Sequence, residues 1–268
     1  MKNTPQIAKE IRQLVVKMLA SAGSGHTAGS LGMADVFSVL YFSDLLHLSP
    51  AQPDDPSRDR IILSNGHICP VWYATLAKRG YFPLDELDTL RQFGSPLQGH
   101  PHKDFSATSI LPGVENTAGP LGQGIGFSVG VALGLRHQSS RVICVCGDGE
   151  LDEGQCWEAF MCAAKYKLTN LTFIIDRNDI QIDGFTHDVM PLESLKEKLT
   201  SFGLCTAEID GHNHESIYSA LKMQSSKPTA IIAKTIPGKG VGFMEGKFEW
   251  HGKVPDHQEA EQALKDLC

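Results

Sequence analysis

Three short runs of apolar residues limit the folds open to this chain more than any other feature. They are RVICVCG (141–147), LTFIID (171–176) and TAIIAKT (229–235), and each is continuously apolar rather than apolar at alternate positions. A strand with apolar side chains on both faces needs cover on both faces, which is typical of a parallel sheet between layers of helices. The runs therefore predict an α/β fold with a mainly parallel central sheet.

Helical patterns lie between and before these strands, so strand and helix alternate through the second half of the chain. A weaker strand is predicted at 204–210 and a short one at 61–63. The length of 268 residues suits one hydrophobic core. We therefore expect a single three-layer domain over 1–268. One helix is predicted to begin at Thr4. Four more are predicted over 33–46, 155–167, 192–202 and 214–224.

Charge and composition argue against several kinds of partner. The net charge of −7 lacks the basic excess that nucleic-acid binding requires. No apolar run reaches the roughly 18 residues of a membrane span, and the charged start is unlike a secretory signal, so we expect a cytoplasmic protein with no membrane partner. Seven cysteines without a CxxC pair fit neither a disulfide framework nor a zinc site. Cys144 and Cys146 are expected to be buried strand residues.

Two long segments, 94–126 and 237–255, carry an unusual number of Gly, Pro and His residues. Irregular segments of this length inside a compact domain tend to be functional loops. We expect the functional site to include them.

The strongest local motif is GDGELDEG at 147–154, between a predicted buried strand and a predicted helix. Ligands of open parallel sheets bind at this end of the strands. Gly147 and Gly149 would let backbone N–H groups approach phosphate oxygens, and Asp148 offers an oxygen ligand suited to Mg²⁺ or Ca²⁺. Alone, the motif is equally consistent with an acidic strand-to-helix turn.

A second strand favours the metal interpretation because it ends in IDRNDIQIDG (175–184), which brings Asn178 to the same edge of the sheet. Asp148, the amide oxygen of Asn178 and the backbone carbonyl near Ile180 could form part of an octahedral shell. Phosphate oxygens and water would complete it. The paired motifs thus predict a site for a metal-bound diphosphate.

Nucleotide-binding alternatives fit less well. GQGIGFSVG at 122–130 is rich in glycine and precedes a helix, but no strand comes before it, which disfavours a nicotinamide-binding Rossmann motif. Lys239 lies in IPGKGVG, without the Ser or Thr or the following helix of a nucleoside triphosphate loop.

The order of the motifs resembles the cofactor-binding first half of transketolases, especially those split into two chains. This resemblance covers nearly the whole sequence and implies the thiamine diphosphate-binding fold of the diphosphate-binding (PP) type. The motifs are GSGH (23–26), SNGH (64–67), GHPH (99–102), TAGPLGQG (117–124), GDGELDEG, DRNDIQIDG (176–184) and WHG (250–252).

By this resemblance, four histidines would converge on the reactive carbon of the cofactor and on the hydroxyls of the sugar: His26, His67, His100 and His251. Imidazoles suit this task because they donate, accept and move protons near neutral pH. The remaining loop histidines that we considered are expected to be solvated: His47, His137, His212 and His257.

The resemblance also implies a set of cofactor contacts. Gly119 and Leu121 would lie near the aminopyrimidine and thiazolium, and Ile182 would pack against the thiazolium ring. Glu153 and Glu158 would lie at the contact with a pyrimidine-binding domain, although the helix dipole explains Glu153 equally well. The full cofactor set is His67, Gly119, Pro120, Leu121, Gly147, Asp148, Gly149, Glu150, Asn178, Ile182 and His251.

The sequence departs from the family pattern in two places. Thr27 stands where the family usually has proline, beside His26. After His251 only a short charged tail remains, so the pyrimidine-binding and C-terminal domains are expected on a second chain, in a heterotetramer with two copies of each.

The implied activity is that of a transketolase, a transferase that moves a two-carbon ketol unit from a ketose phosphate to an aldose phosphate in the pentose phosphate pathway. Thiamine diphosphate, with Mg²⁺ or Ca²⁺, would supply the carbanion chemistry. One alternative is the equivalent subunit of another thiamine-dependent enzyme, either a specialised transketolase or a two-oxoacid dehydrogenase, though the histidines argue against a two-oxoacid. Another is a non-catalytic assembly subunit that holds the cofactor.

Overall fold

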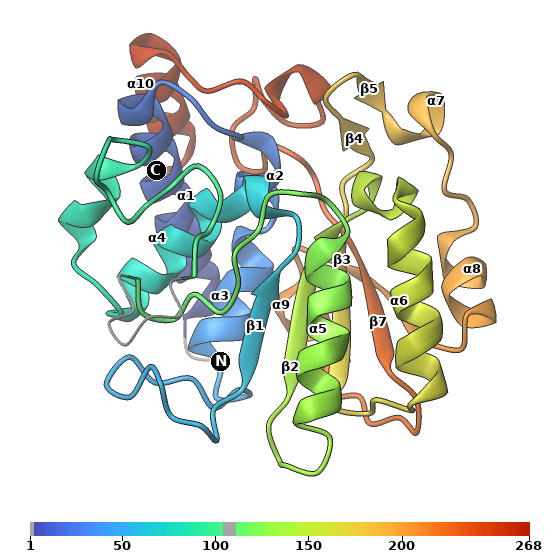
Figure 1. Ribbon diagram of the computed structural model, residues 1–268. Helices are drawn as coiled ribbons and strands as arrows, with labels where there is room; N and C mark the ends of the chain where they lie inside the picture. Colours follow the sequence, from blue (N-terminus) through green and yellow to red (C-terminus); the bar gives the residue numbers. More distant parts are fainter. Residues whose placement is uncertain (1–2, 104–110) are drawn as a thin grey trace.

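The computed structural model describes residues 3–103 and 111–268, and its centre is a five-stranded sheet (Figure 1). Each pair of neighbouring strands in this sheet is parallel, with Val142 opposite Leu171 and Thr172 opposite Thr229. This confirms the parallel sheet expected from the apolar runs. In spatial order the strands are β1 (Arg60–Leu63), β2 (Val142–Gly147), β3 (Leu171–Arg177), β7 (Thr229–Lys234) and β6 (Cys205–Asp210).

Helices cover both faces of the sheet, and β2 shows why its sequence is apolar throughout. Ile143 and Val145 pack into one core, whereas Cys144 and Cys146 face the other, and all four are buried. The burial expected for both cysteines is confirmed. Side chains of the first core come from α1 (Thr4–Ala22), α3 (Ala34–Phe42), α4 (Cys69–Arg79) and α9 (His214–Leu221), and those of the second from α5 (Gln123–Gly134), α6 (Gly154–Lys165) and α8 (Leu195–Ser201).

Two expected features differ in detail. The helix predicted over 33–46 ends at Phe42, because Ser43 has extended backbone angles. The charged tail is a helix, α10 (His257–Asp266), which begins with a capping box between Asp256 and Glu259. Its small apolar face joins the core beside α1, so charge on the outer face concealed an amphipathic helix.

The remaining elements are short. β4 (Ile180–Gln181) and β5 (Gly184–Phe185) form an antiparallel hairpin directly after β3. The others are α2 (Ala28–Gly32), α7 (Thr186–Val189) and four 3₁₀ helices, η1 (Gly66–Ile68), η2 (Leu84–Thr89), η3 (Gly149–Asp152) and η4 (Phe248–Trp250). None of the helices in the described parts of the chain has the length and apolar character needed to cross a membrane.

Candidate active site

A cavity of about 450 Å³ opens at the carboxyl ends of β1, β2 and β3. Both Gly- and His-rich segments contribute to its wall, although residues 104–110 of the first lie outside the described residues. The wall is formed by His26, Asn65, His67, His100, Gly119, Leu121, Gly147, Asp148, Gly149, Glu150, Asn178, Ile180, Gln181, Ile182, Asp183 and His251.

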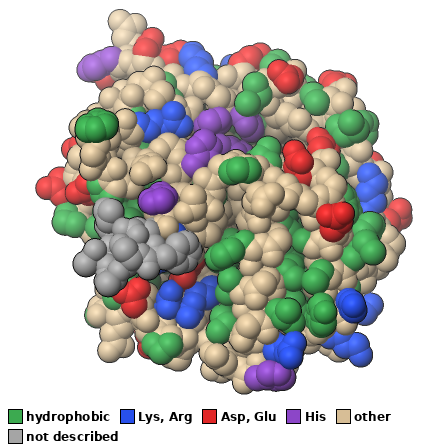
Figure 2. Space-filling view, viewed as in Figure 1, with side chains coloured by type: hydrophobic (Ala, Val, Ile, Leu, Met, Phe, Trp, Pro, Cys, Tyr) green, Lys and Arg blue, Asp and Glu red, His purple; other side chains and the backbone are tan. Residues whose placement is uncertain are grey.

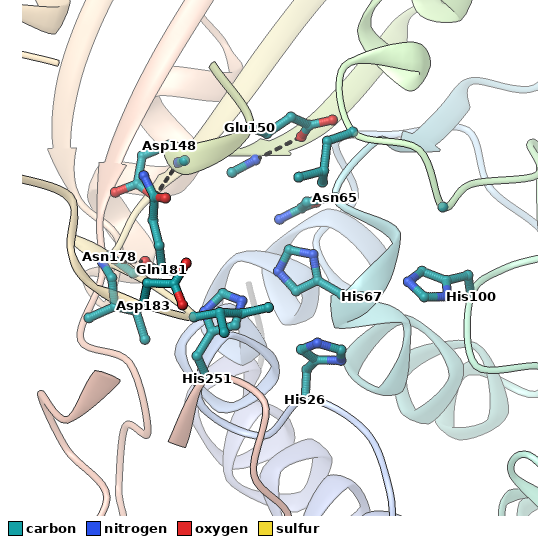
Figure 3. A pocket seen from close by; sticks show the side chains of 16 residues that line it. His26, Asn65, His67, His100, Asp148, Glu150, Asn178, Gln181, Asp183 and His251 are labelled. Carbon is teal, nitrogen blue, oxygen red and sulfur yellow. Dashed lines mark hydrogen bonds between the residues drawn. The ribbon is translucent and has the colours of Figure 1, made fainter. Parts of the chain in front are cut away.

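Three histidine rings from distant parts of the sequence meet in this cavity (Figure 3). The ring centroid of His67 lies 5.1 Å from that of His26 and 5.1 Å from that of His251, and the centroids of His26 and His251 are 5.6 Å apart. His100 lines the same cavity at some distance from this group (Figure 3). The structure thus brings all four expected histidines to one cavity.

These histidines favour the uncharged state at neutral pH. Burial, together with the neighbouring His251 and Arg91, lowers the pKa of His26 to about 4. Burial also lowers the pKa of His67, His100 and His251, and the Arg91 guanidinium opposes protonation of His100 as well. Neutral imidazoles have one donor and one acceptor nitrogen, so they can both hold and move a proton.

Three buried polar atoms on the cavity wall have no hydrogen-bond partner among the described residues: Nδ1 of His26, Nδ1 of His251 and Oδ1 of Asn65. A buried polar group without a partner costs about 1–3 kcal/mol. Because all three lie on the same wall, the cavity fits a polar ligand that supplies the missing partners.

Thr27 connects the loops that carry two of these histidines. It is fully buried, and its Oγ1 donates a hydrogen bond to the backbone carbonyl of Lys253 over 2.7 Å. Thr27 directly follows His26, and Lys253 is two residues beyond His251. Thr27 therefore holds the two loops together.

We expect Thr27→Val to lower the free energy of unfolding by about 1–3 kcal/mol, because it keeps the shape of the side chain but leaves the Lys253 carbonyl without its donor. Urea denaturation measures this loss. Thr27→Ser keeps the hydroxyl and is the matched control. Equal stability of the valine variant and the parent would show that the hydrogen bond does not hold the loops.

Asp148 begins η3 at the end of β2, and its carboxylate is 2% exposed. Its Oδ1 accepts a hydrogen bond from Gly149 N (2.8 Å), and its Oδ2 accepts from Asp179 N (2.9 Å) and from the Arg177 guanidinium (3.0 Å). Burial nevertheless raises the pKa of Asp148 to about 6, since the hydrogen bonds and Arg177 offset only part of the desolvation.

Asn178 lies beside this carboxylate at the end of β3. Its Nδ2 donates to the buried Asp176 carboxylate over 2.7 Å, and its Oδ1 accepts from Ile180 N over 3.1 Å. Burial raises the pKa of Asp176 to about 7. Asp148 shares the Arg177 guanidinium with two exposed carboxylates, whereas Asp176 accepts hydrogen bonds from the neutral side chains of Asn178 and Thr235. A bound cation would offset the remaining negative charge.

The donor set fits a hard cation that also binds ligand oxygens. In residues 3–103 and 111–268, no three His, Cys, Asp or Glu side chains gather as a metal-binding group. A cation here would therefore use Asp148, the Asn178 amide oxygen, a backbone carbonyl such as that of Ile180, and oxygens from the ligand or water.

Glu150 supports the wall instead of pointing a free carboxylate into the cavity. Its Oε1 accepts from Gly122 N (2.7 Å) and from the Ser64 hydroxyl, and its Oε2 accepts from Gly147 N (3.1 Å). This one carboxylate therefore joins the ends of β1 and β2 to the start of α5.

The other sequence-predicted residues vary in their position. Ile182 lines the cavity and is 66% exposed, so it is available to pack against a ligand ring. Pro120 is exposed and is not among the lining residues, although both of its neighbours are. Glu153 and Glu158 are exposed at the start of α6.

The expectation that His212 is solvated was wrong. Its Nδ1 lies 2.7 Å from the Asp35 carboxylate, and its Nε2 accepts a hydrogen bond from Ile236 N over 2.8 Å. Only 13% of its side chain is exposed, because the buried carboxylate on α3 draws the ring inward. The other three histidines expected to be solvated, His47, His137 and His257, are exposed.

Three lining residues were not singled out from the sequence: Asn65, Gln181 and Asp183. All three lie within motifs, Asn65 in SNGH and the other two in DRNDIQIDG. Their position close to a predicted site residue was the only sequence signal for these three residues. Such a position does not show which neighbouring side chains face the cavity.

A parallel sheet with a polar cavity at its carboxyl edge, buried carboxylates and clustered histidines defines a cofactor-binding α/β domain. The family described as "Transketolase, thiamine diphosphate binding domain" matches residues 3–267. The chain therefore belongs to the transketolase family, and this part of it is the thiamine diphosphate-binding domain.

The similar proteins include subunits of specialised transketolases. The chain is 43% identical to the 6-deoxy-6-sulfo-D-fructose transketolase subunit SqwG of Clostridium sp. (strain MSTE9), over 97% of this chain and 94% of that protein. It is 37% identical to an apulose-4-phosphate transketolase subunit of Phocaeicola vulgatus, over 96% of this chain and 90% of that protein.

Solved structures of longer transketolases have the same fold. The transketolase from Leishmania mexicana superposes with a TM-score of 0.92 at 32% identity, over 100% of this chain and 41% of that one. The transketolase from Campylobacter jejuni gives 0.89 at 34% identity, over 98% of this chain and 43% of that one. This chain thus spans about two fifths of the length of these enzymes.

Proposed function

We propose that this chain is a single thiamine diphosphate-binding domain that acts as the N-terminal subunit of a split transketolase. The enzyme would move a two-carbon ketol unit from a ketose to an aldose. One observation carries the proposal: His26, His67 and His251 converge in the same cavity as the Asp148 turn and Asn178.

The acidic edge of the cavity would hold the diphosphate end of the cofactor. Asp148, Asn178 and the Ile180 carbonyl would bind Mg²⁺ or Ca²⁺, and the backbone around Gly147 and Gly149 would approach the phosphates. Thiamine diphosphate, when bound, supplies the carbanion chemistry. The protein binds and orients the reactants, and excludes water.

The histidine end of the cavity would handle the sugar. The unpaired Nδ1 atoms of His26 and His251 are suited to hydroxyl groups, because a neutral imidazole nitrogen can donate to or accept from an O–H. His100 would contact the sugar from the mouth of the cavity, and His67 would contact the cofactor as well. Proton transfer by such groups typically contributes a factor of about 10²–10⁴ in rate.

A second chain would cover the cavity. Exposed apolar side chains lie around it and over the neighbouring helices (Figure 2), including Leu121, Phe127, Met161 and Ile182. Exposed apolar surface of this kind marks a protein interface. The similar subunits of nearly the same length also support a partner. We propose that it supplies the pyrimidine-binding and C-terminal domains in a heterotetramer, with Glu153 and Glu158 at the contact.

The relatives reduce the number of candidate donor sugars. The names of two of them favour a specialised transketolase over one of the pentose phosphate pathway. A two-oxoacid dehydrogenase or a non-catalytic assembly subunit would have no use for the four histidines in the cavity.

The test is ketol transfer by the purified chain, alone and with its candidate partner, in the presence of thiamine diphosphate and Mg²⁺. Xylulose 5-phosphate serves as a donor with ribose 5-phosphate as acceptor, because its transfer to glyceraldehyde 3-phosphate would only regenerate the starting compounds. The donors 6-deoxy-6-sulfofructose and apulose 4-phosphate are tested with glyceraldehyde 3-phosphate as acceptor. We expect turnover only with the partner present and a preference for one donor. Full activity of the single chain would contradict the split enzyme, and no transfer from any ketose by the assembled pair would contradict the reaction.

A further inference from the structure

Arg91 lies between two of the histidine loops and has an unusual backbone. Its φ of 62° falls in the left-handed region, which is uncommon for a residue other than glycine. The hydrogen bond from Arg91 N to the Leu97 carbonyl, over 2.8 Å, fixes this turn. The turn directs an exposed side chain back toward the cavity loops.

The guanidinium reaches both loops. Nη1 lies 3.4 Å from the Ser24 hydroxyl, and Nη2 lies 3.4 Å from the Gly99 carbonyl. Ser24 is two residues before His26, and Gly99 directly precedes His100. Arg91 therefore bridges the segments that position these two rings.

Gly99 leaves the space that this bridge needs. A Cβ atom at Gly99 would stand 2.9 Å from Cζ of Arg91, closer than van der Waals contact allows. Gly99 does not need glycine for its backbone angles, since its φ is not in the left-handed region. The absent side chain thus serves the position of the guanidinium.

Residues 3–103 and 111–268 supply no carboxylate at ion-pair distance from the charge of Arg91. The cation instead faces imidazoles, and it opposes protonation of both His26 and His100. The ring of His26 also lies against those of His67 and His251, and a charge on His251 or His100 would likewise oppose its protonation. For His100, Arg91 is the charged group that opposes protonation.

We propose that Arg91 is a positioning residue that joins the loops of His26 and His100 and places a positive charge beside both rings. The inference rests on the proposed role of these two histidines at the sugar. An imidazole must be neutral to accept a proton from a hydroxyl, and its loop must be fixed for the ring to meet that hydroxyl. Arg91 would fix the loops and add to the effect of burial on the charge of the rings, without touching the substrate.

Histidine titration by NMR, with ¹³C-labelled imidazoles in the full chain alone, tests the charge effect. Arg91→Gln removes the cation, and Gly99→Ala displaces the guanidinium while Arg91 remains. We expect both variants to raise the pKa of His26 and of His100, with a smaller change at His251. Arg91→Lys, which retains the charge, should shift both values less than Arg91→Gln. Arg136→Gln, which removes an exposed cation elsewhere, is the matched control and should shift neither.

Kinetics of the assembled enzyme test the positioning effect. In Arg91→Gln and Gly99→Ala we expect kcat/KM for the ketose to fall roughly 10- to 100-fold. Thiamine diphosphate affinity should equal that of the parent, because Arg91 is not among the residues lining the cavity. Unchanged pKa values of His26 and His100 in Arg91→Gln would overturn the proposal, as would a loss of cofactor affinity as large as the loss of turnover. The titration needs no activity, so an assembled pair without ketol transfer would count only against the proposed function.

Discussion

Replacing Asp148 with asparagine should weaken thiamine diphosphate binding by at least about 100-fold in the presence of Mg²⁺. Loss of groups that merely orient metal ligands costs about 10- to 100-fold in metal affinity, so loss of a ligand charge should cost no less. The substitution keeps the shape of the side chain but only one acceptor oxygen, so the side chain can accept from the N–H of Gly149 or of Asp179 but not from both. Thermal unfolding of the same variant therefore separates a loss of stability from the loss of metal-dependent binding.

Calorimetric titration of the assembled enzyme with thiamine diphosphate, at several Mg²⁺ concentrations, measures this effect. The matched control is Asp152→Asn, because Asp152 is an exposed carboxylate in the same turn and is not part of the cavity wall. The control should bind the cofactor as the parent does. Equal affinity of the Asp148→Asn variant and the parent would remove Asp148 from the metal site.

His251→Ala and His100→Ala should each reduce kcat by about 10²–10⁴-fold, the range expected for loss of a general acid or base. Their effect on stability should be small. Nδ1 of His251 is buried without a hydrogen-bond partner, so its removal relieves an unfavourable group, and substitutions at partly exposed loop positions usually change stability by less than about 0.5 kcal/mol.

Steady-state turnover and thermal unfolding, measured on the same preparations, separate the two effects. His137→Ala serves as the control because His137 is an exposed histidine away from the cavity. A histidine variant that unfolds at a much lower temperature than the parent and still turns over normally would identify that residue as structural.

The fold could be predicted because its signals are local. Each of β2, β3 and β7 is apolar on both faces, and the repeated strand–helix alternation leaves few ways to bury such strands. The same logic underestimated α10, where charged residues outnumber the small apolar ones that reach the core.

From the sequence, only residues within recognisable motifs could be predicted to lie in the site. Asp148 and Asn178 follow strands whose ends must meet at one edge, so their proximity follows from the fold. The environment of His212 could not be predicted, because Asp35 lies 177 residues earlier in the sequence. The contacts of Arg91 with the loops of His26 and His100 are also tertiary, and no local sequence pattern predicts them.

The hydrogen bond between Thr27 and Lys253 spans 226 residues, and this separation sets an order of events during synthesis. At about 5–20 residues per second, the ribosome needs roughly 11–45 s to pass from one partner to the other. The last strand of the sheet, β7, ends at Lys234, so the layered core can assemble before His251 leaves the exit tunnel. A nascent chain can therefore be largely folded and still lack a complete cavity. Cofactor capture would then follow the assembly of the layered core rather than act as a nucleus for folding.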